Sequence, residues 1–307
     1  MYGIALSVAA CLRAGTRVDV AWILDHPDSE QGRGAEAVGL TPGGGKLGSL
    51  LSGALDGQLG ELAAIQGDHG RVLQFDVGAA DAAVSGIEPV TGISCVLVQA
   101  SKLPPELWER LLAREAVCLL SDLEGDAIVS TSLYTADSID EADDDVCRIF
   151  QRGTSASQLT DTRAITGLWP VPQLIMVGGG DIADSLVKLA EMLGWNTVLT
   201  RNTQEATGLI ASTSPLDSVV VAGHDLELTG PALSVALEGD VGYIGAIGPR
   251  RLQEAWVDWL SYRGQTDLSR LHGPAGLEIG AQSPDEIALA VAAQIVANRS
   301  SPKAHTR

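Results

Sequence analysis

The 307-residue sequence has few aromatic residues, and its positive charges are outnumbered by negative ones. Aromatic residues make up 4% of the chain, and the formal net charge is −19 at pH 7. So acidic a protein repels phosphate backbones and anionic lipid surfaces, and it offers few rings on which bases could stack. We therefore expect no nucleic-acid or membrane partner. An anionic ligand must be bound by local dipoles and a few basic side chains.

Cysteine is scarce as well, and its spacing is irregular. No Cys-x-x-Cys pair occurs, which argues against a zinc ribbon and a disulfide framework. We expect no metal site and reduced thiols in a cytoplasmic protein. Cys95 stands in an apolar strand with no base beside it, so a buried structural thiol is favoured over a catalytic nucleophile. The cysteines are Cys11, Cys95, Cys118 and Cys147.

Long apolar runs are missing too. No stretch reaches the about 20 apolar residues that a membrane-spanning helix needs, and residues 1–15 carry no basic leader. These first residues are predicted to form a helix. The acidic run at 137–145 is interpreted as the start of a helix, where carboxylates are favoured, rather than as a metal site.

The order of apolar segments divides the chain into two domains. Residues 1–155 mix helices, strands and a glycine-rich hairpin, which indicates a smaller α+β domain. Residues 156–172 are polar and end in Trp-Pro-Val-Pro, so they are predicted to be a linker. In residues 173–299 strands and helices alternate, which predicts an α/β, Rossmann-like, doubly wound parallel sheet. Residues 300–307 are predicted to be a disordered tail.

The most informative motif is a glycine-rich turn between a predicted strand and a predicted helix. Gly178, Gly180 and Ala183 form Gly-x-Gly-x-x-Ala, which allows a tight turn, the approach of a phosphate and close packing of helix on strand. Backbone amides at the helix start then face the anion. The predicted phosphate-binding residues of this turn are Gly178, Gly179, Gly180, Asp181 and Ile182.

Two features complicate this interpretation. Asp181 either caps the helix or competes with a phosphate for the same amides. About 20 residues after such a turn, dinucleotide sites carry a carboxylate for the ribose. Thr200, Arg201 and Asn202 stand there instead. Three alternatives remain open: Arg201 meets a 2′-phosphate and the ligand is NADP, the ligand is another phosphorylated molecule, or the site binds nothing.

Further candidates follow the next two predicted strands. His224 and Asp225 come after the strand 218–223, where His224 is a candidate proton donor or phosphate contact and Glu227 is close enough in sequence to orient it. A hydrogen bond that organises the loop is the alternative role. Arg250 and Arg251 follow the strand 241–248, and cations at a helix start oppose its dipole, which favours anion recognition.

Several motifs in this second half together resemble the XdhC/CoxI family. They are Gly223-His224-Asp225-Leu226-Glu227-Leu228, YIGAIGPRR at 243–251 and HGPAGLEIGAQSPDEIALAVAAQIVA at 272–297. TPGGGKLGSLLSGALDG at 41–57 and the strand containing Cys95 resemble the family's first domain more loosely. The resemblance implies a Rossmann fold for residues 174–297. It also implies an accessory protein for the maturation of molybdenum hydroxylases such as xanthine dehydrogenase and carbon monoxide dehydrogenase.

The sequence departs from the family pattern at several positions. The cysteine of the family's Ser-Gly-Gly-Cys motif is absent, because Ser52-Gly53 is followed by Ala54-Leu55-Asp56. Asp181 replaces a histidine of the turn, and Pro249 replaces a serine. The resemblance implies a divergent homodimer that binds the molybdenum cofactor, or a related phosphorylated nucleotide, and supports its insertion into an apo molybdenum hydroxylase. Two alternatives stand beside it. One is an NADP-dependent oxidoreductase that uses His224, with Asp225 and Cys95 as further catalytic candidates, and the other is an interaction protein that has lost its ligand.

Overall fold

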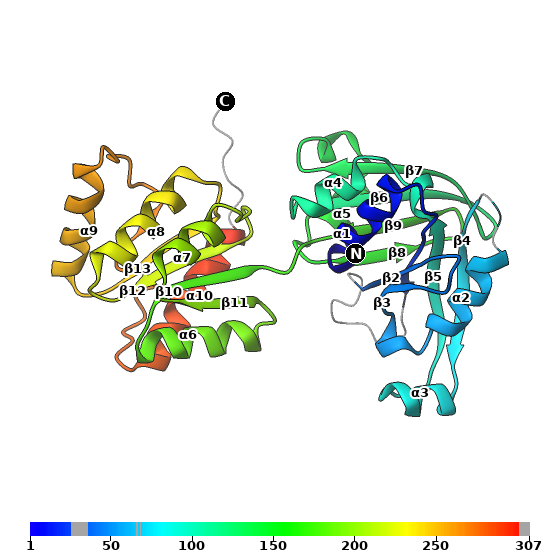
Figure 1. The fold of residues 1–307 in the computed structure, drawn as a ribbon, viewed down its shortest axis with the longest axis horizontal. Coiled ribbons are helices and arrows are strands. Elements are labelled where there is room, and N and C mark those ends of the chain that lie inside the picture. The colour runs from blue at the N-terminus through cyan, green and yellow to red at the C-terminus, as the bar shows by residue number, and fades with distance from the viewer. Residues whose placement is uncertain (26–35, 66, 68, 301–307) are drawn as a thin grey trace. The chain divides into compact units, whose positions relative to one another are not determined.

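The computed structural model describes residues 1–25, 36–65, 67 and 69–300 (Figure 1). The chain divides into two compact units, Met1–Pro170 and Val171–Arg307, and each is described by itself. The predicted tail at 300–307 lies outside the described residues except for Ser300, which ends the last helix. No described helix is long and apolar enough to cross a membrane.

Among its described residues, the first unit has one antiparallel sheet with five helices around it. Its helices are α1 (Tyr2–Arg13), α2 (Asp56–Ile65), α3 (Ala79–Ser85), α4 (Leu107–Leu112) and α5 (Asp144–Phe150). Its nine strands are β1 (Asp19–Asp25), β2 (Ala37–Leu40), β3 (Lys46–Gly48), β4 (Gly70–Val77), β5 (Val90–Gln99), β6 (Val117–Glu124), β7 (Ala127–Thr135), β8 (Ala156–Leu159) and β9 (Arg163–Leu168). They pair in the order β3-β2-β1-β5-β4-β7-β6-β9-β8.

This sheet curls back on itself. The buried indole of Trp22 on β1 donates a hydrogen bond to the hydroxyl of Thr166 on β9, over 3.0 Å, although β1 and β9 lie far apart in the pairing order. The curl encloses one core together with α1 and α4, while α2 and α3 cover a second core on the other face of β1, β4 and β5. Alternation along β1 divides its side chains between the two cores, with Trp22 in the first and Ile23 in the second.

The structure differs from the predicted linker at 156–172. Residues Ala156–Leu159 and Arg163–Leu168 are β8 and β9, and β9 pairs with β6 from Arg163 to Leu168. The polar residues of β8 mark the edge of the sheet, where one side of the strand has no partner strand. Residues 160–162 connect the two strands, and the proline-rich stretch from Trp169 to Pro172 also lacks regular structure, as its prolines favour.

The acidic run at 137–145 begins a helix, as the sequence predicted. The side chain of Asp143 accepts hydrogen bonds from the backbone N–H groups of Asp145 and Val146, both over 3.1 Å, and so caps α5. Arg163 forms an ion pair with the same carboxylate over 2.6 Å. The carboxylates therefore stabilise a helix start and its contact with β9.

The second unit is a parallel sheet of five strands with helices on both faces (Figure 1). The strands are β10 (Gln173–Gly178), β11 (Asn196–Thr200), β12 (Ser218–Ala222), β13 (Tyr243–Ile247) and β14 (Leu271–His272). The helices are α6 (Asp181–Met192), α7 (Thr203–Ile210), α8 (Leu226–Glu238), α9 (Arg250–Tyr262) and α10 (Pro284–Ser300). This confirms the predicted Rossmann-like, doubly wound fold.

The strand order positions the site. The order β11-β10-β12-β13-β14 means that the chain leaves β10 on one side to form β11 and then returns to form β12 on the other side. Helices α7, α8 and α9 pack on one face of the sheet, and α6 and α10 pack on the other. In open α/β sheets, ligands bind in the crevice at such a switch point, outside the carboxyl ends of the strands. Here that crevice lies between the ends of β10 and β12.

Candidate functional site

The turn from β10 to α6 depends on glycine at two positions. Gly178 has a φ of 111°, and a methyl group there would lie 1.6 Å from the carbonyl oxygen of Ala222 on β12. Gly180 has a φ of 109°, and nothing lies within 4 Å of the place where its side chain would be. Gly178 therefore lets two strand ends meet, whereas Gly180 leaves open space in front of the helix.

The start of α6 has backbone N–H groups that can donate hydrogen bonds. The first N–H groups of a helix have no acceptor within it, and Gly180, at the N-cap, supplies no capping side chain. Asp181 is exposed and opens the helix, so its carboxylate does not take the cap position that the sequence left possible. Ile182 is half-buried, and the only hydrogen-bond donor that it can offer is its backbone N–H. The donors remain available to an anion, with the charge of Asp181 beside them.

Arg201 lies against this turn. It follows the last residue of β11, and its Nε donates a hydrogen bond to the carbonyl oxygen of Gly178 over 3.3 Å. A methyl group on Gly179 would lie 2.3 Å from the guanidinium, so the guanidinium rests directly on this glycine. Arg201 is exposed and forms no ion pair with any carboxylate in the described part of the chain. Its charge is thus uncompensated at the edge of the sheet.

The carboxylate of Glu205 also lies at the end of β11. Glu205 is outside the stretch from Thr200 to Asn202, where an acid for the ribose was expected. Glu205, in the first turn of α7, accepts a hydrogen bond from the hydroxyl of Thr200 over 2.5 Å. Its backbone N–H donates to the side chain of Asn202, which caps α7 over 3.0 Å. The signal was the spacing Asn-x-x-Glu of a capping box at the start of α7. Glu205 therefore organises this corner and is already engaged by Thr200.

A pocket of roughly 350 Å³ opens at the switch point. It joins the glycine turn, Arg201 and the loop after β12, which are three separate segments of the sequence. Gly178 and Arg201, for example, are 23 positions apart. This volume is near the lower end of the range of ligand pockets. The pocket is lined by Gly178, Gly179, Arg201, Ala222, Gly223, His224, Asp225, Leu228 and Thr229.

His224 and Asp225 have different environments in this pocket. The Asp225 side chain accepts a hydrogen bond from the backbone N–H of Glu227 over 3.0 Å and caps α8, while its carbonyl oxygen accepts one from the Thr229 hydroxyl. Asp225 therefore organises this loop, a role that the sequence had offered as the alternative for His224. His224 is exposed, and no described side chain, Glu227 included, holds it by a hydrogen bond. It is free to turn toward a ligand.

Arg250 and Arg251 lie elsewhere. Both open α9 and both are exposed, and Arg250 forms an ion pair with Glu254 over 3.2 Å with 93% of its side chain accessible. Arg250 lines a separate pocket of roughly 490 Å³ together with Gly273 and Pro274. The two arginines thus follow the neighbouring strand at the same edge of the sheet, but the described residues do not place them in the pocket of the glycine turn.

Cys95 has no reactive surroundings. It is fully buried on β5 within the core beneath α2. This burial raises the pKa of its thiol to about 12, so the neutral form persists at physiological pH. The structural role that the sequence favoured agrees with this environment.

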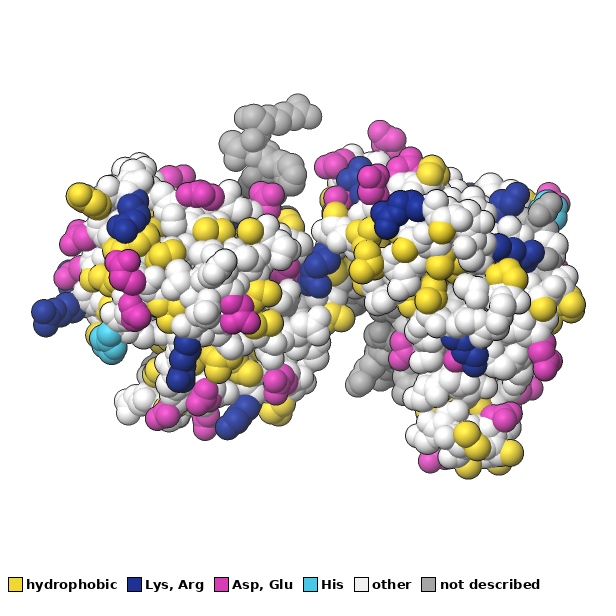
Figure 2. Space-filling model, in the orientation of Figure 1, with side chains coloured by type: hydrophobic (Ala, Val, Ile, Leu, Met, Phe, Trp, Pro, Cys, Tyr) yellow, Lys and Arg dark blue, Asp and Glu magenta, His cyan; other side chains and the backbone are white. Residues whose placement is uncertain are grey.

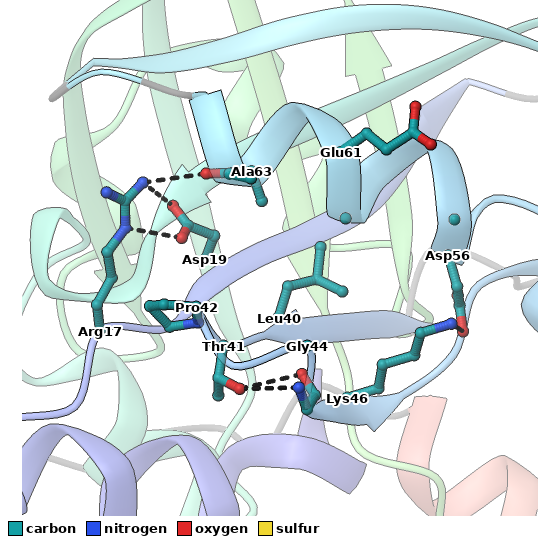
Figure 3. Close-up of a pocket in the computed structure, with 14 residues that line it drawn as sticks. Arg17, Asp19, Leu40, Thr41, Pro42, Gly44, Lys46, Asp56, Glu61 and Ala63 are labelled. Atoms are coloured by element: carbon teal, nitrogen blue, oxygen red, sulfur yellow. Dashed lines mark hydrogen bonds and ion pairs between the residues drawn. The ribbon is translucent and has the colours of Figure 1, made fainter.

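A pocket in the first unit has a different chemistry (Figure 3). It measures roughly 520 Å³ and lies between the β2–β3 hairpin and α2. Two buried carboxylates line it, and each has a cationic partner: Arg17 with Asp19 over 2.9 Å, and Lys46 with Asp56 over 3.6 Å. Lys46 lies on β3 and faces Asp56. Because the cations are compensated, this pocket does not favour an anion as the switch-point pocket does.

Basic side chains are dispersed over the surface. On the face drawn in Figure 2, Lys and Arg side chains occur singly or in small groups among acidic and apolar side chains, and they form no extended basic patch. Within residues 1–25, 36–65, 67 and 69–300, no cluster of three or more His, Cys, Asp or Glu residues could hold a metal ion. Beside the switch-point pocket, the groups that suit an anion are the first backbone amides of α6 and the guanidinium of Arg201.

A model of the XdhC Rossmann domain matches this chain from the first buried strand of the second unit onward. The match covers residues 174–295. The match begins in β10 and ends within α10, so it spans the whole parallel sheet and the switch-point pocket. It confirms the resemblance that the motifs of the second half suggested.

Known proteins similar to this chain include two curated relatives. One, from Bacillus subtilis, is named as a probable xanthine dehydrogenase subunit; it is 26% identical over 159 residues, which are 46% of this chain and 47% of that protein. YqeB of Escherichia coli is 25% identical over 147 residues, which are 41% of this chain and 27% of that protein. The matches thus span less than half the length of either relative.

A solved structure, described as a xanthine dehydrogenase from Bacillus halodurans, aligns with 99% of this chain and 98% of its own. The two are 19% identical, and the TM-score is 0.47.

Proposed function

We propose that this protein is an accessory factor for the maturation of a molybdenum hydroxylase of the xanthine dehydrogenase or carbon monoxide dehydrogenase type. In this role it binds the molybdenum cofactor, or a related phosphorylated nucleotide, and supports its insertion into the apo-enzyme. The XdhC Rossmann domain and the similarity to a probable xanthine dehydrogenase component support the association with such an enzyme. The observation that carries the binding role is the uncapped start of α6 beside an uncompensated arginine.

The residues at the switch point fit a phosphate group. Gly180 leaves open space in front of α6, because a side chain there would meet nothing within 4 Å. The helix start offers backbone donors without a capping side chain, and the guanidinium of Arg201 lies beside the turn. Together they supply hydrogen bonds and positive potential to a phosphate in a protein whose net charge is −19.

Each residue then has a defined task in holding the ligand. The amides after Gly180 donate to the phosphate, Arg201 neutralises its charge, and His224 faces the ligand from the end of β12. Asp225 and Glu205 fix the loops that carry these groups by capping α8 and by binding Thr200. The bound cofactor would supply the redox chemistry of the client enzyme, and this chain would hold and position it.

The direct test is retention of cofactor through purification. The full-length protein is produced in cells with an active molybdenum-cofactor pathway, purified under native conditions, and its small molecules are identified by mass spectrometry. We expect molybdopterin or its nucleotide form to co-purify. The Gly180→Asp variant should lose it, because a carboxylate would then occupy the open space before α6.

A matched control is available at the other end of the same helix. Gly194 also has a positive φ, 74°, and open space around it, so Gly194→Asp introduces the same charge at a positive-φ glycine far from the turn. The control should retain the cofactor. Equal retention by Gly180→Asp and the unmodified protein, or no pterin in either, contradicts the proposed binding role.

A second test addresses the client. Co-expression with an apo molybdenum hydroxylase should raise the fraction of hydroxylase that contains cofactor, measured as molybdenum per polypeptide. We expect the increase with the unmodified protein and with Gly194→Asp, and its loss with Gly180→Asp. No change in molybdenum content on co-expression would contradict the maturation role.

A further inference from the structure

The pocket between the β2–β3 hairpin and α2 has an ion pair at each end, and the two pairs differ (Figure 3). Arg17 closes the first pair, because its Nε and Nη2 donate to the two oxygens of Asp19 over 2.9 and 3.1 Å. Nη2 also donates to the carbonyl oxygen of Ala63 over 3.3 Å. This pair therefore joins α2 to the start of β1, and both oxygens of Asp19 are engaged.

The second pair is open. Asp56 is 5% exposed, and its Oδ1 accepts a hydrogen bond from the backbone N–H of Leu50 over 3.2 Å. Its Oδ2 lies 3.6 Å from the Nζ of Lys46, which is longer than a hydrogen bond, and 48% of the Lys46 side chain is accessible. Within the described part of the chain, no donor reaches Oδ2. A buried carboxylate oxygen without a donor is costly, so an N–H group of a ligand would satisfy it.

Glycines keep the space between the two pairs open. Gly57 and Gly60 line the pocket from α2, and a side chain at either would meet nothing within 4 Å. Neither has a positive φ, so the backbone does not require glycine, which destabilises a helix relative to alanine. Their effect is to expose helix backbone to the pocket, across from the side chain of Leu40. The resulting slot extends about 10 Å along α2, from Asp56 to Ala63, and suits a flat ring.

The charges of the lining favour an uncharged ring over an anion. Three carboxylates and two cations line the pocket, in a chain whose net charge is −19. A carboxylate accepts hydrogen bonds and an ammonium donates them, so Asp56 and Lys46 complement a ring edge with N–H donors beside a carbonyl oxygen. The 2-amino-4-oxopyrimidine ring has this pattern, with two adjacent N–H donors for one carboxylate. Adenine has a single amino group and no carbonyl on its edge.

We infer that this pocket of the first unit binds a 2-amino-4-oxopyrimidine ring, with its N–H groups on Asp56 and its carbonyl oxygen on Lys46. Guanine nucleosides and pterins both contain such a ring. The inference does not depend on the proposed phosphate site, because all residues that line the switch-point pocket belong to the second unit. It assigns to the first unit a binding role of its own.

The test uses ligands without a phosphate. Guanosine, neopterin, inosine and adenosine are titrated into the full-length protein by calorimetry. Inosine keeps the carbonyl and the ring N–H of guanosine and lacks only the 2-amino group. We expect the tighter of guanosine and neopterin to bind about tenfold more strongly than inosine or adenosine, as a bidentate contact with one base edge allows. Which of the two binds more tightly distinguishes a nucleoside from a pterin, and either result supports the site.

Two variants assign the contacts. Asp56→Asn removes the carboxylate but keeps an oxygen that can accept from Leu50, and it should reduce the preference over inosine to about unity. Lys46→Met removes the ammonium from an accessible side chain and should weaken the tighter ligand and inosine alike, by about fivefold, so that the preference remains. A preference that survives Asp56→Asn in a folded protein overturns the assignment.

A second pair of variants tests the slot without removing a charge. Gly60→Leu places a side chain in the open space and should abolish binding, while the melting temperature should not fall, because leucine favours a helix over glycine. Gln58→Leu adds the same side chain to α2 at an exposed position outside the lining and should bind normally. Equal loss of binding in the two variants, or full binding in Gly60→Leu, contradicts the proposed slot.

Absence of binding by both guanosine and neopterin overturns the inference, and so does an equal affinity for inosine. The outcome is separable from that of the proposed function. Gly180→Asp should leave the affinity for the nucleoside or pterin unchanged, and loss of binding in that variant would place the ring in the second unit instead. Failure to retain molybdopterin during purification removes the cofactor assignment and leaves a ring site that passes these tests.

Discussion

The charge of Asp181 is unfavourable for a phosphate at the start of α6, but its side chain does not cap the helix. It opens α6 directly after the glycine turn and is exposed, and the N-cap position belongs to Gly180. Its carboxylate interacts favourably with the helix dipole and unfavourably with any phosphate at the same helix end. The sequence left two roles open for Asp181, capping or competition. In the structure, Asp181 does not cap α6, so only the electrostatic effect of its charge on a phosphate remains.

Replacement of Asp181 by asparagine should therefore raise the affinity for adenosine 5′-monophosphate by about two- to fivefold, the size of one charge–dipole interaction at a helix end. The same change should lower the melting temperature slightly, because the helix loses a favourable acid. Calorimetric titration and thermal unfolding measure the two effects. Asp184→Asn, further along the helix, should change the affinity less. An unchanged or lower affinity in Asp181→Asn contradicts the description.

The buried cysteines make a pH-dependent contribution to stability. Burial raises the pKa of Cys95 and of Cys118 from 9.0 to about 12. The folded protein therefore keeps these protons at pH values where the unfolded chain loses them, so the contribution is intact below about pH 9 and is lost as the pH rises toward 12.

We expect the free energy of unfolding, measured in urea, to fall between about pH 8.5 and pH 10.5. The fall should be smaller in the Cys95→Ala, Cys118→Ala double variant, which lacks both thiols. Alkylation by iodoacetamide at about pH 8 should reach neither thiol until the protein is unfolded. Modification of Cys95 in the native state would show that it is more accessible than the core beneath α2 allows.

At the scale of elements, the contact between α8 and α9 holds one edge of the site in place. The indole N–H of Trp256 on α9 donates to the hydroxyl of Thr229 on α8 over 2.8 Å, and both residues are fully buried. The Thr229 hydroxyl donates in turn to the carbonyl oxygen of Asp225, the residue that caps α8 beside the pocket. One polar chain thus links the α8–α9 contact to the loop after β12.

Replacement of Thr229 by valine keeps the shape but leaves a buried indole N–H without an acceptor. We expect it to lower the free energy of unfolding by about 1–3 kcal/mol. Trp256→Phe removes the donor, so a double-mutant cycle with Thr229→Val should show a coupling of about 1 kcal/mol. Urea denaturation monitored by circular dichroism measures all four proteins. Strictly additive effects would mean that the hydrogen bond contributes nothing to stability.

At the scale of the whole molecule, every residue that lines the switch-point pocket comes from the second unit. That unit contains its own parallel sheet and two buried cores, one on each face. A unit with a complete core is expected to fold alone.

Residues 171–307 should accordingly fold when produced alone and bind adenosine 5′-monophosphate within about twofold of the full-length affinity. Circular dichroism and calorimetry test folding and binding separately. A folded fragment that does not bind the probe would show that the first unit contributes to the site. A fragment that does not fold would contradict the independence of the core.

The local sequence determined a large part of this protein. Strict alternation of strands and helices after residue 172 predicted the parallel sheet, because each apolar strand needs helices on both of its faces. The spacing of Gly178, Gly180 and Ala183 predicted the turn, because a positive φ and a close approach of backbone require glycine there. The helix start at 137–145 was predicted for a similar reason, since its capping interactions are made within a few residues.

Only the tertiary structure decided which distant groups meet. Long-range pairing makes residues 156–168 part of a sheet rather than a linker, and no local composition specifies the partner strand. The strand order places Arg201 on the glycine turn and leaves Arg250 in a separate pocket, although all three segments follow strands of one sheet. Glu205 contacts Thr200 at the end of β11 because the first turn of α7 brings it there, although it lies outside the segment where the motif predicts an acid. Local periodicity and turn chemistry are encoded over a few residues, whereas the neighbours of a charge depend on how whole elements pack.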